Sequence, residues 1–150
     1  MLTATALANG CGYEMVDPDT EPMLQALKRD PMATFRPAPG GRIVLESEVP
    51  YDTFYKTTQA HVVRIFAFRS AERALAARLE AIDAARASGW RMYPRPETPD
   101  GLIYGTRKLA TGPATLTIIA YDDEGLYKVS VRLEHIRCYP HQCKRASRAP

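Results

Sequence analysis

One long helix constrains the fold of this chain more than any other feature of the sequence. Apolar residues recur at the helical period between Ala71 and Ser88, with charged residues on the opposite side. Ser70 is suited to cap the first turn, and Gly89 fits the left-handed position that commonly ends a helix. The expected core stripe is Ala71, Leu75, Leu79 and Ile82, flanked by Ala74, Ala81 and Ala85. A helix with one apolar stripe must bury it against a second layer.

Alternating apolar and polar residues predict the strands of that second layer. The expected strands are 42–49, 61–69, 90–93, 102–110, 114–121 and 126–134, and a short helix over 21–29, capped by Thr20, precedes them. The resulting order is α-β-β-α-β-β-β-β. It predicts the α+β class: a two-layer sandwich in which one main amphipathic helix packs on an antiparallel sheet.

Two of these strands alternate clearly enough to assign their faces. In 126–134, the residues expected to face the core are Tyr127, Val129, Val131 and Leu133. In 42–49, the residues expected to share one face are Ile43, Leu45, Ser47 and Val49, with Glu46 and Glu48 on the other.

The first twelve residues are apolar or small, as at the end of an export signal. Ala8-Asn9-Gly10-Cys11 resembles the lipobox of small bacterial lipoproteins, many of which have no assigned function. The resemblance implies that 1–10 are the remnant of a signal peptide and that Cys11 is the lipid attachment point. It implies an extracytoplasmic, membrane-anchored protein and transfers no activity. Cleavage after Ala6-Leu7-Ala8 for plain secretion, or a cytoplasmic protein with an apolar start, are the alternatives.

The remaining chain divides into a tether, one domain and a tail. Residues 11–20 are polar and carry no periodicity, as expected of a flexible tether, and 21–136 form a single domain. The tail, 137–150, holds four basic residues and no acidic one. We expect it to be solvated, and we expect no nucleic-acid partner, because the tail lacks interleaved aromatic residues. No apolar run approaches the ~18–20 residues that span a bilayer.

The densest group of metal-ligating side chains lies at the C-terminal end, in the segment "HIRCYPHQC". It consists of His135, Cys138, His141 and Cys143. Imidazole and thiolate groups bind zinc and copper, although this spacing matches no standard zinc motif. Export favours a disulfide between Cys138 and Cys143, because disulfides persist in oxidising compartments. Free thiols are the third possibility.

Aromatic residues form a candidate ligand pocket. Those expected on loops at the ends of strands are Tyr51, Phe54, Tyr55, Trp90 and Tyr93. If these loops meet, they wall a pocket; otherwise Phe54 and Trp90 close the edge of the core. The sequence contains no catalytic or nucleotide-binding motif, so we expect no cofactor and no catalytic residue.

These observations favour an extracytoplasmic, membrane-anchored lipoprotein with a non-catalytic binding or envelope-support role. Its partners would be the membrane, through the lipid anchor, and an envelope protein or small ligand. The alternatives are a metal-binding protein that uses the His/Cys cluster and a secreted enzyme or enzyme inhibitor.

Overall fold

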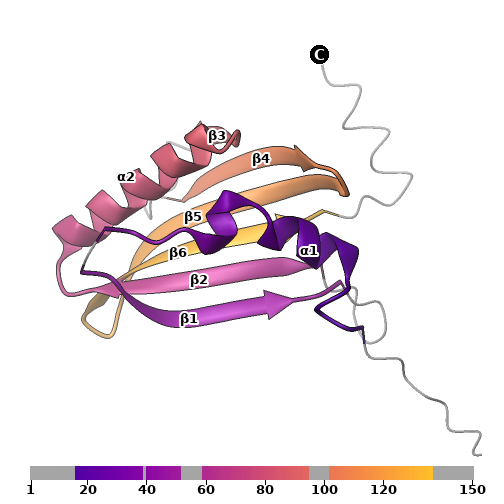
Figure 1. The fold of residues 1–150 in the computed structure, drawn as a ribbon. Helices are drawn as coiled ribbons and strands as arrows, with labels where there is room; N and C mark the ends of the chain where they lie inside the picture. Colours follow the sequence, from indigo (N-terminus) through magenta and orange to yellow (C-terminus); the bar gives the residue numbers. More distant parts are fainter. Residues whose placement is uncertain (1–15, 39, 52–58, 95–101, 137–150) are drawn as a thin grey trace, which may run out of the picture.

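A six-stranded antiparallel sheet forms the centre of the protein (Figure 1). The computed structural model describes residues 16–38, 40–51, 59–94 and 102–136. The helical elements are α1 (Pro22–Lys28), the 3-10 helix η1 (Pro31–Thr34) and α2 (Ala71–Ala87). The strands are β1 (Arg42–Val49), β2 (His61–Phe68), β3 (Arg91–Pro94), β4 (Ile103–Leu109), β5 (Gly112–Asp123) and β6 (Leu126–His135). The predicted α+β class is confirmed, and η1 is the one added element.

The strand order in the sheet is β1-β2-β6-β5-β4-β3. Every neighbouring pair is antiparallel, so β2 and β3 run in the same direction with three strands between them. The helix α2 joins these two strands and contacts β3, β5 and β6, while α1 contacts β2 and β6. In Figure 1 all three helical elements lie over one face of the sheet. No helix in the described part of the chain is long and apolar enough to cross a membrane.

The core lies between this helical layer and the sheet. Val129, Val131 and Leu133 of β6 are buried, as the alternation predicted, and Tyr127 is half-buried. Leu133 pairs with Val62 of β2, and Val129 pairs with Phe66. Because paired residues share a face in an antiparallel sheet, these side chains form a continuous apolar surface beneath the helices.

The core face of α2 differs from the prediction. Leu75 and Leu79 are 50% and 54% exposed, and Ala71 is exposed as well. The buried residues are Ala74, Ala77, Ala81, Ile82 and Ala85. Ile82 and the flanking alanines at 74, 81 and 85 are buried as predicted, so the helix is turned toward the alanine-rich side of the predicted face. Small side chains face the sheet, which lets the helix lie close to it, and the predicted stripe was wrong at Ala71, Leu75 and Leu79.

The strand β1 also departs from simple alternation. The pairing register shifts between Ile43 and Leu45, so Ile43 lies opposite Phe66 while Leu45 lies opposite Ile65. Such an irregularity inserts one residue and turns the following side chains to the other face. The prediction that Ile43 and Leu45 share a face was therefore wrong.

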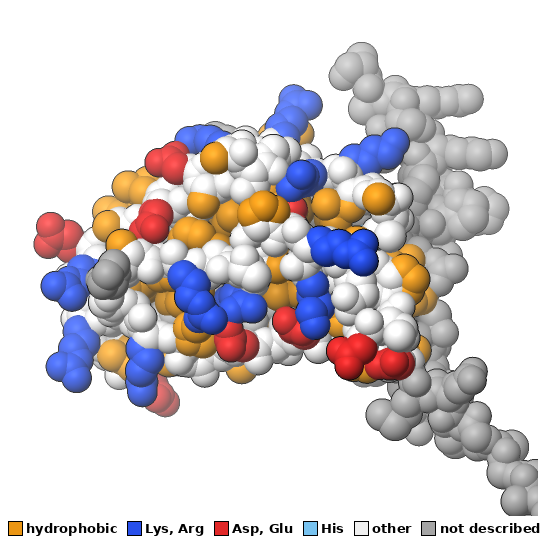
Figure 2. Space-filling view, in the orientation of Figure 1, with side chains coloured by type: hydrophobic (Ala, Val, Ile, Leu, Met, Phe, Trp, Pro, Cys, Tyr) orange, Lys and Arg blue, Asp and Glu red, His pale blue; other side chains and the backbone are white. Residues whose placement is uncertain are grey.

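The same shift places Glu46 and Glu48 on the face that carries the helical layer. Glu46 forms ion pairs with Arg64 and with Arg36, which follows η1. The Glu48 carboxylate lies 2.7 Å from Lys28 Nζ of α1, and this contact raises the pKa of Lys28. Figure 2 shows acidic and basic side chains next to one another over β1 and β2. Ion pairs thus close the core at this edge of the sheet.

The short helix α1 begins one residue later than predicted. Its N-cap is Glu21, whose carboxylate accepts hydrogen bonds from the backbone N–H groups of Met23 and Leu24. Thr20 was the predicted cap, but its hydroxyl lies instead near Asp17. Capping by Glu21 buries Leu24 and Leu27 against the sheet.

Candidate functional site

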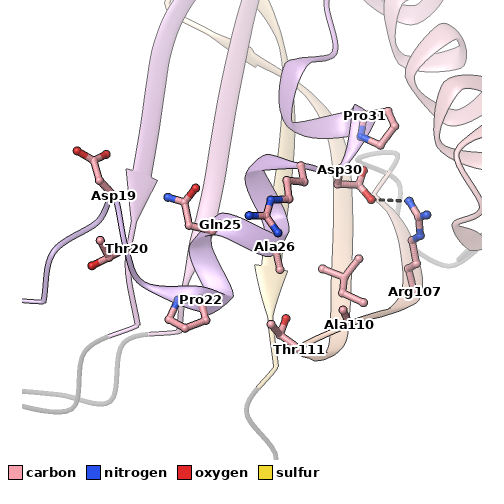
Figure 3. A pocket seen from close by; sticks show the side chains of 12 residues that line it. Asp19, Thr20, Pro22, Gln25, Ala26, Asp30, Pro31, Arg107, Ala110 and Thr111 are labelled. Atoms are coloured by element: carbon pink, nitrogen blue, oxygen red, sulfur yellow. Dashed lines mark hydrogen bonds and ion pairs between the residues drawn. The ribbon is translucent and has the colours of Figure 1, made fainter.

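A cleft of about 670 Å³ lies between the N-terminal helical segment and the turn that joins β4 to β5 (Figure 3). One wall comes from α1 and the residues beside it, and the other comes from β4 and the turn. The lining residues are Asp19, Thr20, Pro22, Gln25, Ala26, Arg29, Asp30, Pro31, Arg107, Leu109, Ala110 and Thr111. Two segments far apart in the sequence therefore build this site.

A buried carboxylate joins the two walls. The Asp30 side chain is 0% exposed, and its Oδ2 accepts a hydrogen bond from Arg107 Nη1 at 2.6 Å (Figure 3). Its Oδ1 accepts hydrogen bonds from Trp90 Nε1 at 3.1 Å and from the Met32 backbone N–H at 2.9 Å. Both oxygens are thus satisfied, as a buried charge requires. The Arg107 side chain, which is 33% exposed, is thereby held at the cleft.

The local sequence explains how Asp30 reaches this position. Asp30 is the N-cap of η1, and Pro31 occupies the first turn, where the missing N–H of proline costs nothing. No sequence pattern identified Asp30 as a site residue, because Asp30-Pro31 also fits the end of a helix. The available signal was an aspartate directly before a proline, which is also a capping pattern.

The opposite wall of the cleft rests on a buried histidine. His135 is 1% exposed, and its Nε2 lies 2.9 Å from Thr111 Oγ1. A Cβ atom on Gly112, whose φ is +132°, would lie 3.3 Å from the His135 ring, so glycine leaves room for the imidazole beneath the turn. Burial lowers the pKa of His135, which keeps the ring neutral at pH 7. His135 therefore acts as an uncharged anchor for Thr111.

The charges at the cleft are mixed. Arg29 is exposed, and its guanidinium makes no hydrogen bond or ion pair with another described residue. Arg107 is neutralised by Asp30, and its side chain is only partly buried. Asp19 lies on the rim, and the Thr111 hydroxyl and the Gln25 side chain add polar groups. This arrangement suits a polar ligand that carries a carboxylate, because guanidinium groups bind carboxylates in a fork geometry.

The aromatic residues predicted to form a pocket lie at different places in the structure. Trp90 is buried in the core beside Asp30. Tyr93 lies opposite Tyr104 in the β3–β4 pair, on the sheet face away from the helices, with the Arg91 guanidinium over its ring. Tyr51 follows β1, at the other edge of the sheet, and packs partly against the core. Phe54 and Tyr55 lie outside the described residues.

The predicted lipid, disulfide and metal residues fall mostly outside the described part of the chain. Cys11, Cys138, His141 and Cys143 all lie there. His135 alone is described, at the end of β6, where its backbone N–H donates to the Ala60 carbonyl. Within the described ranges, no three His, Cys, Asp or Glu side chains lie close enough together to hold a metal ion.

Comparison with known proteins identifies no relative of this chain. No protein-family model matches the chain. Searches among curated proteins and among solved structures find no significant match.

Proposed function

We propose that this protein is an extracytoplasmic lipoprotein, anchored to the membrane through a lipid on Cys11, that binds a carboxylate-bearing envelope component without catalysing a reaction. The location is supported by the lipobox-like residues 8–11 and by the polar segment that follows them. Two or more acyl chains on such a cysteine hold a protein stably at a membrane, since each buried CH₂ contributes about 0.8 kcal/mol.

The binding role is supported above all by the way Asp30 fixes Arg107 at the cleft. A guanidinium held in place by a buried carboxylate loses little conformational freedom when it contacts a ligand, which favours binding. Arg29, on the opposite wall, supplies a second donor that has no partner among the described residues. Asp19 and Thr20 also line the cleft, so the proposed tether enters the domain beside the binding site.

Metabolic labelling tests the anchor. The gene, expressed in a bacterial host with its upstream genomic codons, should incorporate a radioactive fatty acid, and Cys11→Ala should abolish the label. Labelled protein should sediment with membranes. Unlabelled protein in the cytosol would contradict both the anchor and the location.

Site-specific photo-crosslinking tests the cleft. A photoreactive amino acid at Ala26, which lines the cleft, should give a defined adduct in intact cells, and Arg29→Glu should suppress that adduct. The matched control carries the photoreactive group at Ala76, an exposed position in the first half of α2 that does not line the cleft. Equal adducts from both positions, or an adduct unaffected by Arg29→Glu, would contradict the assignment.

A metal-binding role for the C-terminal His/Cys cluster is the second candidate. The observation in its favour is that His135 Nδ1 is buried and has no hydrogen-bond partner among the described residues. Metal retained on purification and lost in Cys138→Ser would support this function. A Cys138–Cys143 disulfide in the native protein would exclude it, because thiolates and not disulfides ligate metal.

A further inference from the structure

A second hollow lies at another place on the molecule, where β2 passes into α2. Its volume is about 420 Å³. The residues that line it are Gly40, Arg42, Ala67, Phe68, Arg69, Arg73 and Leu126. None of them lines the cleft beside α1, so the two sites are separate. In Figure 2 basic side chains stand at the left end of the molecule, where β1 begins and α2 starts.

Three arginines surround this hollow, and no acidic residue among the described ones lines it. The guanidinium groups of Arg42, Arg69 and Arg73 make no hydrogen bond or ion pair with any other described residue, in contrast to Arg36, Arg64, Arg86, Arg107 and Arg132. In the adjoining β5–β6 hairpin, Asp123 is already paired with Lys128. Like charges that converge without a counter-charge repel one another.

The position of Arg73 adds to this repulsion. Arg73 lies in the first turn of α2, which Ser70 caps by accepting a hydrogen bond from the Arg73 backbone N–H. The N-terminus of a helix carries partial positive charge, so a cation there is disfavoured and an anion is favoured. Glu72 in the same turn already supplies one negative charge, and an anion in the hollow would in addition offset the repulsion among the three arginines.

Buried residues form the floor of the hollow, and exposed side chains form its rim. Phe68 and Ala67 are buried beneath it. The Arg73 guanidinium lies against the backbone of Gly40, where φ is +122° and an added Cβ would be 3.0 Å from Nη1. Arg42 and Arg69 are exposed, so their side chains can move onto a ligand.

We propose that this hollow, here called the arginine site (Arg42, Arg69 and Arg73), binds a phosphate group. A carboxylate has two oxygens and matches one guanidinium fork. Inorganic phosphate presents at least three terminal oxygens and one to two negative charges, and a phospholipid phosphodiester presents two terminal and two ester oxygens with one negative charge. Three guanidinium groups around one hollow match the phosphate. The group belongs either to a soluble phosphate or to a phospholipid headgroup, which share this chemistry.

The test uses the full 150-residue chain carrying Cys11→Ala, so that no acyl chain contributes to binding. Inorganic phosphate is added at constant ionic strength while the backbone amide signals of Gly40 and Ser70 are followed by nuclear magnetic resonance. We expect saturable shifts. Arg73→Gln should weaken the association about tenfold, as expected for loss of a hydrogen bond to a charged group. Arg42→Gln is the second variant, in case Arg73→Gln does not fold.

Arg86→Gln is the matched control, because Arg86 lies in the last turn of the same helix, away from the hollow. Vesicles of phosphatidylglycerol and of phosphatidylcholine form the second arm. Saturable association with inorganic phosphate assigns a soluble ligand, and association with phosphatidylglycerol vesicles alone assigns a lipid headgroup. Association with neither probe overturns the arginine site, as does association that Arg73→Gln and Arg42→Gln change no more than Arg86→Gln does. The cleft beside α1 is unaffected by either result.

Discussion

Asp30 and Trp90 are 60 positions apart in the sequence, yet Trp90 Nε1 donates a hydrogen bond to Asp30 Oδ1 at 3.1 Å in the buried interior. Arg107, 77 positions from Asp30, donates to the other carboxylate oxygen. One carboxylate thus links three places in the chain. These are η1, Trp90 just before β3, and Arg107 in β4. It joins the helical layer to the β4–β3 edge of the sheet and holds the two walls of the cleft together.

Removing that carboxylate should be costly. We expect Asp30→Ala to lower the free energy of unfolding by about 3–5 kcal/mol, because it leaves the Arg107 charge and the Trp90 N–H without their acceptor. Urea denaturation measures this change. Asp83→Asn is the control: Asp83 is an exposed acid of α2 whose contact with Arg86 is long, and its loss should cost less than about 1 kcal/mol. Equal stability of the two variants would contradict the role of Asp30.

Trp90 and Tyr93 should respond differently to loss of their polar atoms. Trp90→Phe keeps a ring in the core but removes the donor to Asp30, so we expect a loss of about 1.5–3 kcal/mol. Tyr93→Phe removes a hydroxyl on the open face of the sheet and should change stability by less than about 0.5 kcal/mol. Thermal unfolding of both variants checks this, and the reverse order would place Tyr93, not Trp90, in the core network.

The sheet could be predicted from the sequence because β6 alternates strictly. A strand has only two faces, and the apolar residues of β6 all lie on one of them, so only that face can be buried. These residues are Val129, Val131 and Leu133. A helix offers more orientations. In α2, both an alanine-rich face and a leucine-bearing face follow the helical period, and the distance to the sheet decides which is buried. That distance depends on side chains of other elements, so the pattern alone misplaced Leu75 and Leu79.

The cleft could not be predicted from the sequence, for a related reason. Asp30, Trp90 and Arg107 belong to three segments that no local pattern connects. Asp30-Pro31 directly follows the end of α1, but no sequence pattern identifies the partners of the carboxylate. The reversal in β1 is similar, because a single inserted residue between Ile43 and Leu45 leaves no compositional mark.

The orientation of α2 leads to a direct test. Leu75→Gln and Leu79→Gln should each change the free energy of unfolding by less than about 0.5 kcal/mol, because both side chains are half-exposed. Ala81→Leu should lower it by about 1–3 kcal/mol, since Ala81 is fully buried against the core and a larger side chain overpacks it. Chemical denaturation compares the three variants. If Leu75→Gln strongly lowered the free energy of unfolding and Ala81→Leu left it unchanged, the orientation predicted from the sequence would be the correct one.

His135 should make stability depend on pH in one direction. Burial lowers the pKa of His135 from its ordinary value of 6.5, so the unfolded chain takes up a proton more readily than the folded one as the pH falls. Well above pH 6.5 both states are neutral at this position, and His135 contributes no pH dependence. Below pH 6.5 the unfolded state is stabilised, and the free energy of unfolding should fall between pH 7 and pH 5. Urea titrations at these pH values measure the slope.

Two histidine variants separate this effect from other acid-sensitive groups. His135→Gln should lower stability at pH 7, because it disturbs the contact with Thr111, but it should also flatten the slope between pH 7 and pH 5. His61→Gln is the matched control, because it removes the other described imidazole, which lies half-buried at the start of β2. If His135→Gln keeps the full slope, the acid sensitivity arises elsewhere and the buried imidazole is not its source. A slope lost only in His135→Gln would show that acid weakens the protein at the point where His135 supports the Thr111 wall of the cleft.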